Sequence, residues 1–135
     1  MSEDKIGEFV GKSFEDGGRG PDSYDCWGLV KDVFSSFGIE VPDYKISCFA
    51  SKEIDSKIEE CKRQWIRLDK PEVPCLVVIK ADPNVPRACT HCGVYVLPGK
   101  FLHAQNNRGS ILTPTNHPYW KTRIVGYYKW NGSKS

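Results

Sequence analysis

The hydrophobic pattern of the chain changes near its middle, from the spacing of an amphipathic helix to a series of short strands. Within 25–37 the apolar residues recur every three or four positions, as on the buried face of a helix. These residues are Cys26, Leu29, Val30, Val33, Phe34 and Phe37. Gly38 is expected to end this helix, and Pro42 prevents its continuation. The sequence therefore predicts one long helix that begins next to a cysteine.

After Trp65 the chain consists of short apolar runs separated by turns rich in Pro, Gly and Asn, which is typical of strands. The expected strands are 64–68, 75–80, 91–97, 100–105, 109–113 and 123–130. Weaker helical patterns are present at 3–12 and 51–64. Helices followed by strands predict an α+β fold with an antiparallel sheet. A length of 135 residues suits one domain, expected to span 1–135 with a frayed tail at 131–135.

Composition and charge exclude several classes of function. Lys and Arg number 19 and Asp and Glu 17, which leaves a net charge of +2 without a basic stripe, so no nucleic-acid partner is expected. No apolar run approaches the roughly 20 residues of a membrane helix, so no membrane partner is expected. The first residues, Met1 to Asp4, are acidic where a signal peptide is basic and then apolar, which predicts a cytoplasmic protein at synthesis. The six cysteines are therefore expected to be mostly reduced thiols.

Cys26 lies in the first turn of the predicted helix, after a loop rich in turn residues at 16–23. A helix N-terminus stabilises negative charge, and the thiolate is the reactive form of cysteine. The position is therefore where a nucleophilic cysteine would be placed. A cysteine on a helix face can also be a small apolar residue of the core, and for Cys26 taken alone that interpretation is favoured.

Two of the three histidines favour the nucleophile instead. His91 begins the predicted strand 91–97, and His103 lies on the next strand. A nucleophilic cysteine needs a base, and the base needs an orienting partner. A three-residue turn at 97–99 would place His103 opposite Gly93, so that both imidazoles point to one face as diagonal neighbours. A two-residue turn would place the two histidines on opposite faces.

Three segments of the chain resemble, in this order, the sequence blocks of the NlpC-type cysteine peptidases, which cut the stem peptides of bacterial cell walls. The segments are 17–30, which contains Asp-Cys-Trp-Gly at 25–28, then 91–95 and 101–104. The resemblance covers nearly the whole chain. The form Gly-Gly-Arg-Gly-Pro-Asp at 17–22, with Trp after the cysteine, is most similar to the phage-tail branch of the family.

The resemblance implies a papain-like fold and a triad in which Cys26 is the nucleophile, His91 the base and His103 the orienting residue. It also implies that Asp25 helps to bind the amino group of the substrate and that the backbone N–H of Cys26 forms part of an oxyanion hole. The implied reaction is hydrolysis of an amide bond in a peptidoglycan stem peptide, commonly between the γ-carboxyl of D-glutamate and a diamino acid. No cofactor or metal is implied, and the branch suggests phage tail proteins as further partners.

Two residues near the predicted nucleophile depart from the family pattern. Phe14 stands where many relatives have a tyrosine, so one polar contact at the active site is lost. Tyr24 is the candidate to supply a hydroxyl in its place. Trp27 replaces a common serine, and its bulk is expected to narrow or reshape the substrate cleft. These departures leave a second hypothesis open, that the chain is a phage tail-assembly protein which keeps the fold with weak or lost activity.

A third hypothesis is a zinc site built on Cys89 and Cys92, with His91 between them and another cysteine as a further ligand. The other cysteines considered are Cys48, Cys61 and Cys75. Incidental thiols are the favoured interpretation, because a second paired motif is missing and Cys92 alternates to the face opposite His91. His117 is expected at the surface. Core packing, rather than a sugar-binding groove, is favoured for the late aromatic residues Trp120, Tyr127, Tyr128 and Trp130.

Overall fold

The structure is a computed structural model, and it describes residues 3–43, 64–80, 91–105 and 108–131. The helix expected at 51–64 falls outside the described residues except for Gln64. Three of the cysteines considered as zinc ligands also lie outside them: Cys48, Cys61 and Cys89. Within the described ranges, no helix is long and apolar enough to cross a membrane.

Six strands form one sheet among the described residues, and all six coincide with the expected strands to within one residue at each end. They are β3 Trp65–Leu68, β4 Cys75–Ile79, β5 His91–Leu97, β6 Lys100–Gln105, β7 Gly109–Pro114 and β8 Ile124–Trp130. The strand order is β3-β8-β4-β5-β6-β7, and each neighbouring pair is antiparallel. Two short strands, β1 (Ser13–Phe14) and β2 (Ser23–Tyr24), form a separate parallel pair. The predicted α+β class with an antiparallel sheet is confirmed.

The long helix α2 spans Cys26–Ser36, within the range 25–37 predicted from the apolar spacing. Gly38 ends it in the left-handed conformation, with φ at +82°. The N–H groups of Gly38 and of the next residue bind back to the carbonyls of Ser35 and Phe34, at 2.9 and 3.0 Å. This Schellman arrangement satisfies carbonyls that the end of a helix would otherwise leave without partners. The predicted role of the glycine is therefore confirmed.

The first helix, α1, spans only Glu3–Gly7, which is shorter than the predicted 3–12. The reason lies in β7, where Ser110 binds the segment that follows the helix. Its Oγ donates a hydrogen bond to the carbonyl of Phe9 at 2.6 Å, and its own carbonyl accepts from the N–H of Gly11 at 2.9 Å. Backbone groups that a longer helix would use internally are thus bound to the sheet instead.

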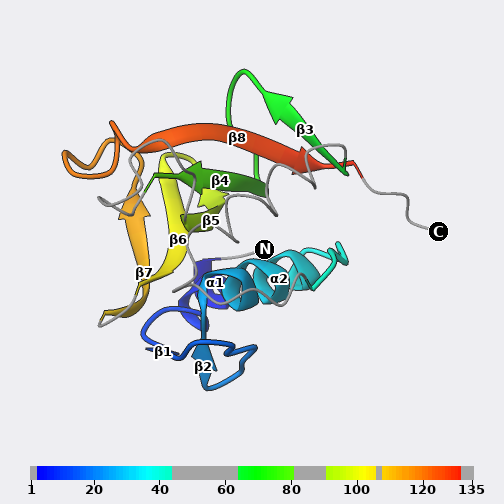
Figure 1. Cartoon of the computed structure of the whole chain (residues 1–135), viewed down its shortest axis with the longest axis vertical. Coiled ribbons are helices and arrows are strands. Elements are labelled where there is room, and N and C mark those ends of the chain that lie inside the picture. The colour runs from blue at the N-terminus through cyan, green and yellow to red at the C-terminus, as the bar shows by residue number, and fades with distance from the viewer. Residues whose placement is uncertain (1–2, 44–63, 81–90, 106–107, 132–135) are drawn as a thin grey trace.

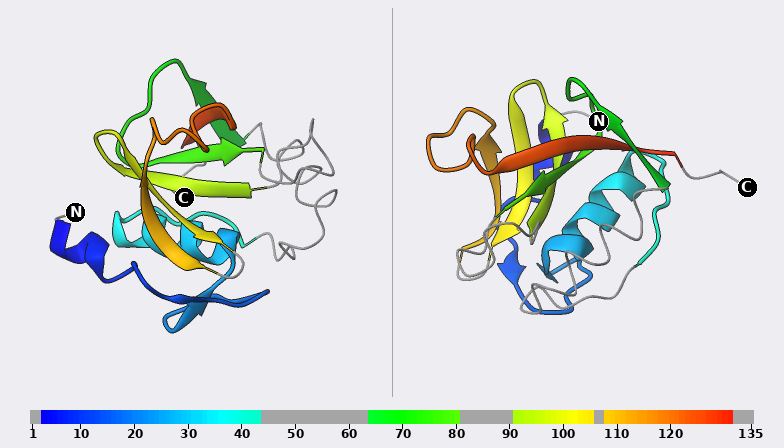
Figure 2. Two further views of the ribbon diagram at one scale, coloured as in Figure 1. Left: turned by 90° about the vertical axis from the view of Figure 1, so that its left-hand side faces the viewer. Right: turned by 45° about the horizontal axis from the view of Figure 1, so that its top comes forward.

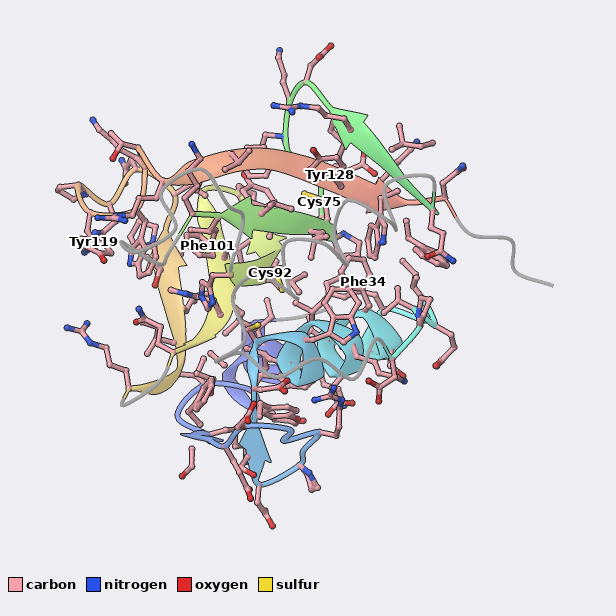
Figure 3. All side chains as sticks on the ribbon, viewed as in Figure 1. Phe34, Cys75, Cys92, Phe101, Tyr119 and Tyr128 are labelled. Atoms are coloured by element: carbon pink, nitrogen blue, oxygen red, sulfur yellow. The ribbon has the colours of Figure 1, made fainter. Side chains whose placement is uncertain are left out.

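Helix α2 covers one face of the sheet and packs against β5 and β6 (Figure 1). Side chains alternate between the faces along each strand, so each face has an apolar cluster of its own. On the helix side the strands contribute Cys92, Val94, Leu102 and Tyr128. The opposite cluster contains Cys75, Val77, Ile79, Tyr95, Phe101 and Trp120. Figure 3 labels members of both clusters, among them Cys92 on the helix side and Phe101 on the other.

The turn between β5 and β6 differs from the predicted one. The last residue of β5 pairs with the first residue of β6, so the turn has two residues, 98–99, and not three. A bulge after Tyr95 adds one residue to β5 and restores the pairing of Val94 with Leu102. Because the bulge offsets the shorter turn, the register around the two histidines is the one expected from a three-residue turn.

Candidate active site

Cys26 is the first residue of α2 and is buried, with 3% of its surface exposed. The helix packs against β5, and the two elements run in the same direction in Figure 1 and in the left view of Figure 2. Cys26 at the start of the helix and His91 at the start of the strand therefore lie at the same end of this packed pair. The N-terminal end of a helix stabilises a thiolate at this position.

Asp25, the residue before the predicted nucleophile, is fully buried and caps α2. One carboxylate oxygen accepts hydrogen bonds from the N–H of Gly28 at 2.7 Å and from the Arg19 guanidinium at 2.8 Å. The other oxygen accepts from the N–H of Gly17 at 3.0 Å. Arg19 also binds the carboxylate of Asp43 through Nε and Nη2. The glycine-rich loop and the start of the helix are thus one hydrogen-bonded unit that fixes the position of Cys26.

Gly28, the glycine of the Asp-Cys-Trp-Gly segment, lets this loop lie directly on the first turn of the helix. A Cβ at Gly28 would collide with the carbonyl oxygen of Gly18. The same carbonyl accepts hydrogen bonds from the N–H of Asp25 at 3.2 Å and from Arg19 at 3.0 Å. A side chain at Gly28 would push the loop away from the N-cap of α2. The glycine three residues after Asp25 is therefore required by the packing of the loop on the helix.

The two predicted histidines are in contact. His91 Nε2 and His103 Nδ1 lie 2.9 Å apart, and both side chains are buried. Gly93 leaves room for the side chain of His103, because a Cβ there would lie 3.0 Å from the Cβ of His103 and 2.5 Å from the carbonyl oxygen of Leu102. The hydrogen bond uses Nε2 of His91, which leaves Nδ1 as the ring nitrogen available for proton transfer.

Two residues around the histidine pair were not predicted as part of a site. Thr113 on β7 is 4% exposed, and its Oγ1 lies 2.9 Å from Nε2 of His103. Trp120 stacks on the ring of His91 and meets the ring of His103 edge to face, with centroids 6.0 and 4.9 Å apart. The register between β6 and β7, in which Thr113 pairs with Phe101, places Thr113 on the face that carries His103. His103 also contacts Phe101 on this face, and Cys92 lies on the opposite face, as predicted.

Burial governs the charge of both histidines. It lowers the pKa of His91 from 6.5 to about 4. The pKa of His103 is also lowered, first by burial and then by the neighbouring His91 and His117. The cause is desolvation, which disfavours a charged imidazolium in the interior. At neutral pH each ring is therefore neutral and carries one proton, the form in which an imidazole can accept a proton from a thiol.

Folding stability is expected to decrease as the pH is lowered from 6.5 towards 4. In this range the unfolded chain takes up a proton at His91 while the folded protein does not, so the free energy of unfolding falls and then levels off below the folded pKa. The full contribution of His91 is about 3 kcal/mol. Urea unfolding at a series of pH values measures this contribution, and His91→Gln is expected to flatten the dependence of the free energy of unfolding on pH. Equal slopes for wild type and His91→Gln would contradict the assignment.

The other predicted substrate-contacting residues lie in the protein interior or at its margin. The Tyr24 hydroxyl donates a hydrogen bond to Asp32 at 2.6 Å; burial and this bond raise its pKa. Trp27 is buried, donates from Nε1 to the carbonyl of Pro42 at 2.9 Å and packs edge to face on Trp65. Phe14 is partly buried and packs against the helix-side cluster. This geometry favours structural roles for Tyr24 and Trp27 over the expected contacts with substrate.

The zinc hypothesis is tested only in part by the described residues. Cys92 faces α2, whereas Cys75 belongs to the opposite cluster and so does not share a site with it. In the portion of the chain that the structure describes, no three His, Cys, Asp or Glu side chains are grouped as metal ligands. His117 is exposed, as predicted.

Comparison with known protein families matches residues 11–129 to the NlpC/P60 family. Among curated proteins, the chain is 28% identical over 121 residues to the murein DD-endopeptidase MepS/murein LD-carboxypeptidase of Escherichia coli, a match that covers 89% of this chain and 56% of that protein. It is 32% identical over 118 residues to the probable endopeptidase p60 of Listeria innocua, covering 87% of this chain and 22% of the relative. The chain thus spans about half of the first relative and a smaller part of the second.

Solved structures give the same fold at lower identity. NlpC1 from Trichomonas vaginalis aligns with a TM-score of 0.68 and 20% identity, over 93% of this chain and 41% of that one. An NLP/P60 family protein from Staphylococcus aureus, described as similar to a lipoprotein, aligns with a TM-score of 0.66 and 20% identity, over 96% and 40%. The fold is therefore the papain-like α+β fold that the sequence motifs implied. Because the family match extends over most of its length, the chain belongs to the NlpC/P60 family.

Proposed function

We propose that this chain is a cysteine peptidase that hydrolyses amide bonds in peptidoglycan stem peptides. The observation that carries the proposal is that Cys26 at the start of α2 lies at the same end of the helix–sheet pair as His91. The buried contact of His91 with His103 is on the face of the sheet away from α2, with Phe101 and Trp120. A helix N-terminus, a neutral imidazole and a second imidazole that orients it are the groups that nucleophilic catalysis by a thiol requires.

In the first half of the proposed reaction, Nδ1 of His91 takes the proton from the Cys26 thiol, and the thiolate attacks the carbonyl carbon of the substrate. The N–H of Cys26 at the helix start stabilises the negative charge on the carbonyl oxygen. When the tetrahedral intermediate collapses, the carbon–nitrogen bond breaks and His91 gives its proton to the leaving amine. The product is a thioester between Cys26 and the acyl part of the substrate.

In the second half, water hydrolyses the thioester. His91 removes a proton from the water molecule, whose oxygen attacks the thioester carbonyl. The carbon–sulfur bond breaks, the carboxylic acid leaves, and the proton on His91 returns to Cys26. His103 supports both halves by binding Nε2 of His91 and holding the ring in one orientation.

The substrate class is inferred from the relatives. The Escherichia coli relative is named for endopeptidase and carboxypeptidase action on murein, and the Listeria relative is named as a probable endopeptidase. We infer a bond between the γ-carboxyl of D-glutamate and a diamino acid, which the sequence resemblance implies. The names of the Escherichia coli relative make DD and LD bonds of the same polymer the competing choices.

Incubation of the protein with muropeptides, followed by mass spectrometry of the products, tests this choice. The panel contains a free stem tetrapeptide and a cross-linked dimer, so that each bond gives products of different mass. A new amine on the diamino acid, together with a product that ends in D-glutamate, is the expected result. Cleavage at the cross-link or at the terminal residue instead would contradict the proposed bond. It would still support the proposal that the chain is a peptidase.

Phe14 is the observation that favours a second function, a phage tail-assembly role with weak or lost activity. Its side chain packs on the helix-side cluster and has no hydroxyl to offer at the site. Phe14→Tyr measures the consequence: an increase in kcat by tenfold or more would indicate that the natural residue weakens catalysis. Unchanged activity in this variant would remove the reason for the second function.

A further inference from the structure

We propose that Thr113 is a positioning residue, whose hydroxyl accepts a hydrogen bond from His103 and thereby sets the tautomer of both histidines. The observation is a continuous row of buried polar atoms across three strands, from His91 to His103 at 2.9 Å and from His103 to Thr113 at 2.9 Å. His103 is fully buried and Thr113 nearly so, which excludes water from both contacts. The effect on catalysis rests on the proposed function, whereas the effect on the tautomers does not.

The row of atoms permits two arrangements of protons. In the first, Nε2–H of His91 donates to Nδ1 of His103, and Nε2–H of His103 donates to Oγ1 of Thr113. In the second, the threonine hydroxyl donates to Nε2 of His103, and Nδ1–H of His103 donates to Nε2 of His91. Each arrangement satisfies both contacts, because a neutral imidazole carries one donor and one acceptor and a hydroxyl can act as either.

Only the first arrangement suits a base. It leaves Nδ1 of His91 without a proton, so that this atom can accept one from Cys26. After Nδ1 accepts this proton, His91 carries protons on both nitrogens. Its Nε2–H still donates a hydrogen bond to the unprotonated Nδ1 of His103. The second arrangement puts the proton of neutral His91 on Nδ1, where it blocks transfer. Thr113 makes the first arrangement available, since it supplies the acceptor for Nε2–H of His103.

Removal of the hydroxyl is expected to reverse the tautomers. In Thr113→Val the shape of the side chain is kept and Nε2–H of His103 loses its acceptor in a buried site, which is unfavourable. The proton then moves to Nδ1 of His103, where His91 accepts it, and the proton of His91 moves to its own Nδ1. Thr113→Ser keeps a hydroxyl and is expected to retain the wild-type tautomers.

Long-range ¹H–¹⁵N spectra of protein labelled with ¹⁵N-histidine read the tautomers directly, without any substrate. The expected result is Nε2–H for His91 and His103 in the wild type and in Thr113→Ser, and Nδ1–H for both in Thr113→Val. Thr115→Val is the matched control, because Thr115 follows the end of β7 and its hydroxyl bonds only weakly, at 3.4 Å, to the carbonyl of Gly99. A wild-type His103 that carries its proton on Nδ1 would overturn the proposal, and this measurement does not depend on a variant that folds. Unchanged tautomers in a folded Thr113→Val would overturn it as well.

Kinetics on the stem peptide separates this inference from the proposed function. Thr113→Val is expected to lower kcat about tenfold with little change in KM, since the hydrogen bond orients the base and does not touch the substrate. Thr113→Ser is expected to restore kcat, and Thr115→Val to leave it unchanged. If the wild type cleaves no peptide and the tautomers are as expected, the proposed function fails and the assignment of Thr113 holds. Normal kcat in a folded Thr113→Val would contradict the positioning role.

Discussion

Replacement of Cys26 by alanine is expected to abolish hydrolysis of stem peptides while leaving the fold intact. The thiol sulfur is the only atom of this residue that can form the proposed thioester. Loss of a nucleophile lowers kcat by about 10⁴-fold or more. The fold should tolerate the change, because the removal of one buried sulfur costs only about 1–2 kcal/mol. Product formation measured by chromatography, together with a thermal unfolding curve, separates lost chemistry from lost folding.

Cys75→Ala is the matched control for this experiment. Cys75 is also a buried cysteine, and it lies in the cluster on the face of the sheet away from α2. Burial raises the pKa of its thiol to about 12, so the side chain stays protonated and unreactive at neutral pH. The variant is expected to keep full activity. Activity that survives Cys26→Ala, or disappears in a folded Cys75→Ala, would contradict the assignment of the nucleophile.

Replacement of Asp25 by alanine is expected to cause the largest loss of stability among these variants, about 3–5 kcal/mol. The carboxylate has no exposed surface and satisfies three donors, the N–H groups of Gly17 and Gly28 and the guanidinium of Arg19. Alanine would leave these donors without a partner and an arginine without one of its two counter-charges. It would also remove the N-cap of the helix on which Cys26 lies.

Urea unfolding measures the effect, with Asp22→Ala as the control. Asp22 lies in the same loop but is exposed, so its replacement is expected to change the free energy of unfolding by less than about 0.5 kcal/mol. Because the cap fixes the helix start, Asp25→Ala should also lower kcat in the fraction of protein that remains folded. A loss of stability no larger than that of Asp22→Ala would show that the buried network does not anchor the helix.

The elements that could be predicted from the sequence are those with a strong local signal. Helix α2 has an apolar stripe and a terminating glycine, and each strand has an apolar run bounded by turn residues. The contact between His91 and His103 followed from the alternation of side chains and from a choice of turn length. That choice was wrong in detail: the turn has two residues, and a bulge after Tyr95 restores the expected register.

What could not be predicted depends on contacts between distant parts of the chain. The end of α1 is set by Ser110, about a hundred residues further on, which binds the backbone of Phe9 and Gly11. The contact of Thr113 with His103 depends on the register between β6 and β7, and the pattern of apolar residues does not specify this register. Asp25 was identified as a site residue, but its burial and its bond to Arg19 required the loop to fold back on the helix.

Detection of the covalent intermediate tests the central claim most directly. The protein is mixed with an amide stem peptide, quenched in acid within the first turnovers and digested with pepsin, and the fragments are analysed by mass spectrometry. The proposal predicts an acyl group on the fragment that contains Cys26, and its absence from the same fragment of Cys26→Ala. Hydrolysis that proceeds without an acylated fragment, or with the acyl group on another cysteine, would contradict the claim that Cys26 is the nucleophile.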